Sequence, residues 1–177
     1  MNDLDRERVI ESGKRLLSTI YEGERTPELE SGNSYLLKEK NPEEGFRSCF
    51  DKIKEYGAGY CLSRNNPTKI KEMYPVDDVS ISFYWLTNLK GKNKFAPDEL
   101  SLISHSMINF LQEEGGIIFM DGVESILKHN SFSRFLGILD HLVDVVDVEE
   151  GVFVMSLDPR TVSERRLAQI EQKFELL

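Results

Sequence analysis

Short apolar runs alternate with amphipathic stretches along most of this chain. Uninterrupted apolar runs of about four to eight residues indicate buried strands, whereas apolar residues three or four positions apart indicate helices. Strands are predicted at residues 34–38, 60–63, 79–86, 117–120 and 152–157. Helices are predicted at residues 42–56, 68–74, 98–114, 123–128, 131–146 and 161–176. Because strands and helices alternate, we expect a three-layer α/β sandwich with a mainly parallel, five-stranded sheet.

A separate amino-terminal region precedes this pattern. Residues 3–22 carry an incomplete apolar stripe among charges, which is typical of a helix, and a polar connector with Gly23 and Pro27 follows. We therefore divide the chain into an N-terminal helix and linker, residues 1–30, and an α/β domain, residues 31–177. Periodicity does not distinguish a helix that packs on its own domain from one that mediates dimerisation, and both interpretations stay open.

The predicted strand at residues 117–120 leads from a glycine pair into a lone aspartate, Asp121. Four consecutive apolar residues are typical of a strand that is buried on both faces. In mononucleotide-binding α/β proteins, an aspartate at this position faces Mg²⁺ beside a phosphate-binding loop. Asp121 is therefore interpreted as a metal ligand or a relic of one. The alternative is a cap for the helical turn that begins at Gly122.

The loop after the first predicted strand does not have the sequence of a phosphate-binding loop. Residues 37–45 contain no GxxxxGK[ST] motif, and their one glycine comes late. Glu43 and Glu44 lie in the first helical turn, where acidic side chains repel a phosphate. We expect no working P-loop and no bound cofactor, which leaves Asp121 without its usual partner.

Residues that follow the strands form the candidate ligand or anion cleft, because ligands of parallel sheets bind beyond the carboxyl ends of the strands. They are Arg64, Asn66, Asp121, Glu124 and Asp158. Arg64 is a candidate for binding an anion. In the alternative interpretation it pairs with a carboxylate such as that of Asp121 or Glu124, while Asn66 caps the next helix.

Composition and charge argue against binding to nucleic acids and insertion into membranes. The chain has 22 basic and 31 acidic residues, and this net charge of −9 disfavours binding to nucleic acids. No apolar run approaches the roughly 20 residues of a membrane span, and the amino terminus lacks a signal-peptide core, so a cytoplasmic protein without a membrane partner is expected. Cys49 and Cys61 have no CxxC spacing and are interpreted as reduced, buried thiols.

No catalytic or metal-binding motif is recognisable. His105, His129 and His141 are scattered and lack metal-ligand spacing with one another or with a cysteine. The GxSxG turn that carries a nucleophilic serine is absent from the sequence. We therefore predict neither a metal site nor a catalytic triad.

Several motifs in combination resemble the archaeal domain of unknown function (DUF) 835 family. They are Tyr60–Pro67 (YCLSRNNP), Phe119–Glu124 (FMDGVE), His129-Asn130, and Ser156–Pro159 (SLDP) with Glu164–Leu167 (ERRL). The resemblance runs from about Ser31 to the carboxyl terminus. It implies a relative of the RecA/KaiC-type nucleoside-triphosphatase core that has lost its Walker A loop. It also implies that the fourth predicted strand lies between the first and third, with the fifth outside the first, and it supplies no established activity.

Two hypotheses of function follow. The first is a non-enzymatic protein-interaction or signalling module on a degenerate nucleotide-binding fold, which self-associates through residues 1–30 or the sheet edges as a homodimer or higher oligomer. The alternative is an atypical nucleotide- or anion-binding protein, a weak NTPase with ATP and Mg²⁺ as its cofactors. Arg64 would then contact phosphate, Asp121 would hold Mg²⁺ and Glu124 would act as a base. DNA-binding regulation is a third hypothesis, which the charge of −9 disfavours.

Overall fold

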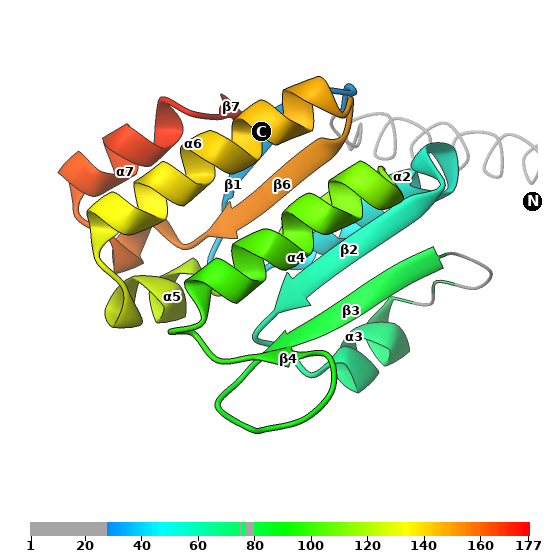
Figure 1. The fold of residues 1–177 in the computed structure, drawn as a ribbon, viewed down its shortest axis with the longest axis horizontal. Coiled ribbons are helices and arrows are strands. Elements are labelled where there is room, and N and C mark those ends of the chain that lie inside the picture. Colours follow the sequence, from blue (N-terminus) through cyan, green and yellow to red (C-terminus); the bar gives the residue numbers. More distant parts are fainter. Residues whose placement is uncertain (1–27, 75, 77–79) are drawn as a thin grey trace, which may run out of the picture.

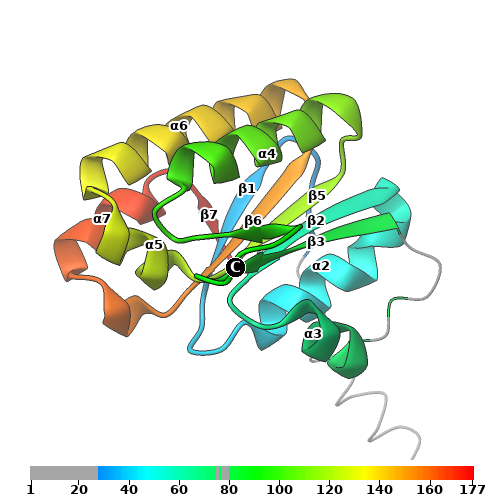
Figure 2. The same cartoon turned by 60° about the horizontal axis from the view of Figure 1, so that its bottom comes forward.

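The computed structural model describes residues 28–74, 76 and 80–177. They form a single sheet with helices on both of its faces, which confirms the predicted α/β class (Figures 1 and 2). The helix predicted at residues 3–22 lies outside the described residues. No helix in the described ranges combines the length and the apolar character needed to cross a bilayer.

The sheet is parallel throughout and has seven strands instead of the five predicted. They are β1 (Ser34–Lys38), β2 (Ala58–Ser63), β3 (Ser80–Leu86), β4 (Lys94–Phe95), β5 (Ile117–Met120), β6 (Val152–Leu157) and β7 (Glu175–Leu176). The helices are α2 (Glu43–Tyr56), α3 (Pro67–Met73), α4 (Leu100–Glu113), α5 (Val123–His129), α6 (Phe132–Val148) and α7 (Glu164–Glu171), with a 3₁₀ turn, η1, at Pro159–Thr161.

The two strands that were not predicted, β4 and β7, are two residues long and lie at opposite edges of the sheet. The helix predicted at residues 161–176 is therefore wrong in its last part. α7 ends at Glu171, and the chain then extends so that Leu176 pairs with Leu36 of β1. Such short segments carry too few residues to show a periodicity.

The strand order is β4-β3-β2-β5-β6-β1-β7. β5 therefore lies on the β1 side of β3, as the RecA/KaiC resemblance implied, but its direct neighbours are β2 and β6. The implied place of the fifth predicted strand outside the first is wrong, because β6 lies between β5 and β1. The register from Gly59 opposite Ile117 to Leu62 opposite Met120 defines the β2–β5 pair. Hydrophobic patterning identifies the buried strands but carries no information about which strand is the neighbour, so this difference was not visible in the sequence.

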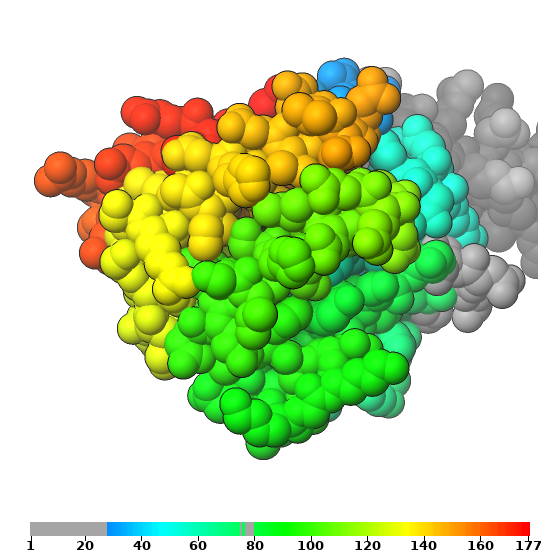
Figure 3. Space-filling view, in the orientation of Figure 1, coloured from blue at the N-terminus to red at the C-terminus, as the bar shows by residue number. Residues whose placement is uncertain are grey.

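β5 is buried on both faces, as its apolar run predicted. Ile118 and Met120 join the core under α4, α5, α6 and α7, whereas Ile117 and Phe119 join the core under α2 and α3. In the space-filling view, the side chains of α4 and α6 form a continuous layer over the first of these faces (Figure 3). The two cysteines, Cys49 of α2 and Cys61 of β2, are free thiols buried in the second core, as predicted. The central strands thus hold their carboxyl ends in a fixed position.

The chain leaves β2 and β5 in opposite directions. From β2 it passes through α3 to β3, on the face that α2 also covers, and from β5 it passes through α5 and α6 to β6 on the other face. The two connections diverge at the carboxyl ends of these adjacent strands. In open α/β sheets a crevice forms at such a switch point and is the usual place for a ligand.

Candidate functional site

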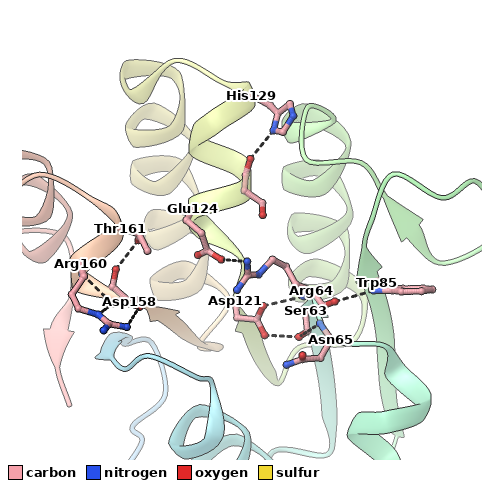
Figure 4. Close-up of polar contacts among 11 residues, drawn as sticks. Ser63, Arg64, Asn65, Trp85, Asp121, Glu124, His129, Asp158, Arg160 and Thr161 are labelled. Atoms are coloured by element: carbon pink, nitrogen blue, oxygen red, sulfur yellow. Dashed lines mark hydrogen bonds and ion pairs between the residues drawn. The ribbon is translucent and has the colours of Figure 1, made fainter.

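Asp121 and Ser63 lie side by side at the switch point, because Leu62 and Met120 pair immediately before them (Figure 4). The hydroxyl of Ser63 donates a hydrogen bond to Oδ2 of Asp121, and the backbone N–H of Arg64 donates to Oδ1 at 3.0 Å. The interpretation of Asp121 as a cap of the following helix is wrong. The N-cap of α5 is Gly122, and no side chain bonds the helix start. Asp121 instead links the ends of two neighbouring strands.

Burial governs the chemistry of the Asp121 carboxyl group. The residue is 4% exposed, and this desolvation raises the pKa of its carboxyl group to about 6. The hydrogen bonds from Ser63 and from the Arg64 backbone act in the opposite direction, as does the positive charge of Arg64. At neutral pH the carboxylate carries its charge, and each of its oxygens accepts a hydrogen bond from the protein.

Arg64 pairs with Glu124, which confirms the expectation that this arginine meets a carboxylate. Nη1 of Arg64 lies 2.5 Å from Oε1 of Glu124, with the arginine half-exposed and the glutamate mostly buried. The left-handed conformation of Gly122 (φ +79°) makes room for the pair, since a Cβ there would lie 2.7 Å from Cγ of Arg64. The carbonyl oxygen of Arg64 accepts a hydrogen bond from Nε1 of Trp85 at 3.0 Å. The backbone and side chain of Arg64 are therefore both tied to the protein.

Asn66 and Asp158, the other two predicted site residues, cap turns. Oδ1 of Asn66 accepts a hydrogen bond from the N–H of Thr68 at 3.0 Å and caps α3, as expected in the alternative interpretation. Asp158 accepts hydrogen bonds from the backbone N–H of Arg160 at 3.0 Å and from Nε and Nη2 of the Arg160 guanidinium at 3.0 and 2.7 Å, and these contacts lower its pKa to about 2. Figure 4 shows Asp158 in a cluster of its own with Arg160 and Thr161, apart from Asp121.

Glu39 lies at this edge, as expected of a residue that follows a strand, but it was not among the five candidate cleft residues. It directly follows β1, and its carboxylate accepts hydrogen bonds from the N–H groups of Glu44 (3.0 Å) and Gly45 (3.2 Å) at the start of α2. The hydroxyl of Ser156, at the end of β6, donates a third at 2.7 Å. Burial raises the pKa of Glu39 above its ordinary value, although the three hydrogen bonds act against this. The only sequence signal was its position after a strand.

Gly45 allows this arrangement. A Cβ at this position would lie 2.3 Å from Cε2 of Phe119 on β5 and 3.0 Å from Oε1 of Glu39. No real side chain tolerates the first distance without a shift of the ring or the helix. The glycine therefore lets the first turn of α2 approach both the sheet and the glutamate closely.

A cavity of about 480 Å³ opens at this edge of the sheet. Its charged lining has five carboxylates, those of Glu39, Glu43, Asp121, Glu124 and Asp158, and three basic side chains, those of Lys40, Arg64 and Lys69. One wall is apolar and comes from α2, α3 and Tyr74. Across the described part of the chain, no three His, Cys, Asp or Glu side chains are grouped so that they could hold a metal ion. The cavity is thus predominantly acidic and its central groups are already paired.

The fold is that of an α/β protein with a parallel sheet. At the switch point, the carboxyl ends of its strands are linked by polar side chains of the protein itself. The family model described as "Protein of unknown function (DUF835)" matches residues 39–174. The chain belongs to this family, as the motifs at β2, β5 and β6 indicated. No curated protein matches the chain.

Proposed function

We propose that this protein is a non-enzymatic interaction module with a role in signalling or regulation. The observation that carries the proposal is the position of Glu39. Its carboxylate accepts the N–H groups at the start of α2, the helix that follows the first strand. N–H groups at such a helix start are the donors that a bound phosphate uses in nucleotide-binding folds. An incoming phosphate would have to displace Glu39, with the loss of its three hydrogen bonds.

The remaining groups that hydrolysis would need are also paired with one another. Each carboxylate oxygen of Asp121 accepts a hydrogen bond, so a Mg²⁺ ion at this position could use only the remaining lone pairs of a buried carboxylate. Glu124 pairs with Arg64, so the base and the phosphate contact of the nucleotide hypothesis would have to separate before either could act. Each pairing stabilises the unliganded edge, and this favours a structural role for the three side chains.

The cavity supports a second candidate function, the binding of a nucleotide or another anion. Arg64 is half-exposed, and Lys40 and Lys69 line the same space. Arg64 and Glu124 both line this cavity, so a bound anion would compete with Glu124 for the guanidinium. In this case ATP with Mg²⁺ bound by Asp121 would be the ligand to test first.

Calorimetric titration with ATP, ADP and GTP, each with and without Mg²⁺ and up to millimolar concentration, tests the proposal. We expect no saturable heat for the wild-type protein. Saturable, Mg²⁺-dependent binding that Asp121→Ala abolishes without lowering the melting temperature would establish the second candidate instead. If a lower melting temperature is the only effect of Asp121→Ala, this carboxylate has a structural role.

The sheet edges support the interaction part of the proposal. Each edge ends in a strand of two residues, β4 or β7, so the described residues leave most of the neighbouring strand without a partner on that side. Unpaired strand edges are templates for pairing with another chain. Self-association or binding of a protein segment would use such an edge, and analytical ultracentrifugation of the full chain measures the first of these. A monomer at all concentrations would exclude self-association.

A further inference from the structure

The outer edge of β3 is open over most of its length. Only its last two residues pair with β4. The N–H groups of Trp85 and Thr87 donate to carbonyl oxygens on the β4 side at 2.9 Å each. Because backbone groups alternate along a strand, the N–H and C=O groups of Ile81 and Phe83 point to this same edge. In residues 28–74, 76 and 80–177, nothing pairs with them.

A groove of about 650 Å³ runs along this edge, between β3, α3 and the loop that precedes β4. Figure 2 shows α3 and this loop on either side of β3. Among the described residues, the charged side chains that line the groove are three lysines, Lys71, Lys92 and Lys94, and none is a carboxylate. This is a local reversal of sign in a chain with a net charge of −9.

Two of the three lysines lie over aromatic rings of β3. Nζ of Lys71 is 4.9 Å from the centre of the Phe83 ring, and Nζ of Lys94 is 5.5 Å from the centre of the Trp85 ring. On this face of β3, Phe83 is buried beneath Lys71, whereas Ile81 and Trp85 are partly exposed. The groove combines open main-chain donors and acceptors, partly exposed apolar side chains at Ile81 and Trp85, and positive charge.

We propose that this groove, the β3 groove, binds an extended acidic segment of a partner protein, which adds to the sheet as a strand beside Ser80–Tyr84. Main-chain hydrogen bonds to Ile81 and Phe83 would supply affinity, and the alternating side chains would supply selectivity. Carboxylates of the segment would face the lysines, which favours acidic over basic segments. The inference rests on the proposed function, since it names the chemistry of the partner of an interaction module.

Fluorescence anisotropy with a labelled peptide of about ten residues, in which glutamate and valine alternate, tests this inference on the full chain. We expect saturable binding at low ionic strength and none for the peptide with lysine in place of glutamate. Methylation of every second backbone nitrogen of the peptide should weaken binding by about tenfold or more, because it removes the ladder hydrogen bonds.

Charge reversals on the protein distinguish binding in the β3 groove from non-specific attraction between the peptide and positive charges elsewhere on the protein. Lys92→Glu with Lys94→Glu should weaken binding of the acidic peptide by about tenfold or more. Lys54→Glu with Lys128→Glu changes the net charge equally on exposed helix positions outside the groove and should leave binding unchanged.

Four results with these probes would overturn the inference, and a fifth concerns the oligomeric state. They are no binding of the acidic peptide, equal binding of the N-methylated peptide, equal loss with both pairs of charge reversals, and preferential binding of a single-stranded oligonucleotide. Dissociation of a dimer by Lys92→Glu with Lys94→Glu would make a second copy of the chain the occupant, and would also overturn it. None of these results bears on the binding of ATP, ADP or GTP, so failure of this inference is distinguishable from failure of the proposed non-enzymatic role, which nucleotide titration tests.

Discussion

Replacing Asp121 by asparagine tests whether burial raises the pKa of the carboxyl group at this edge of the sheet. Burial raises the pKa of Asp121 from 3.8 to about 6. Because the folded-state pKa is the higher one, the stability that this group contributes is fully present below about pH 4 and is lost as the pH rises to about 6. Asparagine does not titrate. The free energy of unfolding of Asp121→Asn, minus that of the wild type, should therefore rise across this range.

The size of the rise follows from the pKa difference. About two pKa units at ~1.4 kcal/mol each give about 3 kcal/mol, and the side chain is too buried for solvent to screen this strongly. Asparagine keeps a carbonyl oxygen for the Arg64 N–H and offers its amide to the Ser63 oxygen. Urea denaturation of both proteins at several values from about pH 4 to about pH 7 measures the difference. Trp85, the single tryptophan, lies at this edge and reports unfolding by fluorescence.

Asp158→Asn is the matched control, because its environment has the opposite effect. The Arg160 contacts lower the pKa of Asp158 to about 2, so its contribution to stability is present above about pH 4 and is lost only as the pH falls below that value. The difference between Asp158→Asn and the wild type should be constant from about pH 4 to about pH 7. A difference that is also constant for Asp121→Asn would refute the reasoning from burial.

Two further predictions concern contacts at the site, the close packing of Gly45 and the ion pair of Arg64 with Glu124. Gly45→Ala should lower the free energy of unfolding by about 1–3 kcal/mol, because its methyl group would lie 2.3 Å from a ring carbon of Phe119. Gly137→Ala, in a helix with open space around it, should raise that free energy by about 0.5–1 kcal/mol, and equal effects of the two would contradict the close packing. A double-mutant cycle with Arg64→Ala and Glu124→Ala should give a coupling of about 0.5–1 kcal/mol, since the arginine is half-exposed; zero coupling would contradict the pair.

Hydrophobic periodicity was sufficient to predict the long elements of this fold. The helix at residues 42–56 and the strand at residues 152–157 agree with α2 and β6 to within one residue, because each buries a clear apolar pattern. The two-residue strands and the strand order were not predictable in this way. Their positions depend on which segments meet in three dimensions, and the pattern of a single segment does not contain that information.

The candidate site was predicted in part, for the same reason. The rule that strand ends gather at one edge correctly brought Arg64, Asp121 and Glu124 together. It did not single out Glu39, whose role depends on the approach of α2 to within reach of its carboxylate. That approach requires Gly45 to face Phe119, a contact between residues far apart in the sequence. A glutamate after a strand, taken alone, is an ordinary surface residue.

The backbone amide signals of Glu44 and Gly45 in nuclear magnetic resonance spectra test the central claim most directly. If Glu39 holds these N–H groups, addition of inorganic phosphate or ATP with Mg²⁺ to millimolar concentration should leave both signals of the wild-type protein unchanged. In Glu39→Ala the freed N–H groups should respond to phosphate, which shows that the probe is sensitive. Saturable shifts of both signals in the wild-type protein would contradict the claim that Glu39 occupies the phosphate-binding N–H groups. They would make nucleotide binding the favoured function of the protein.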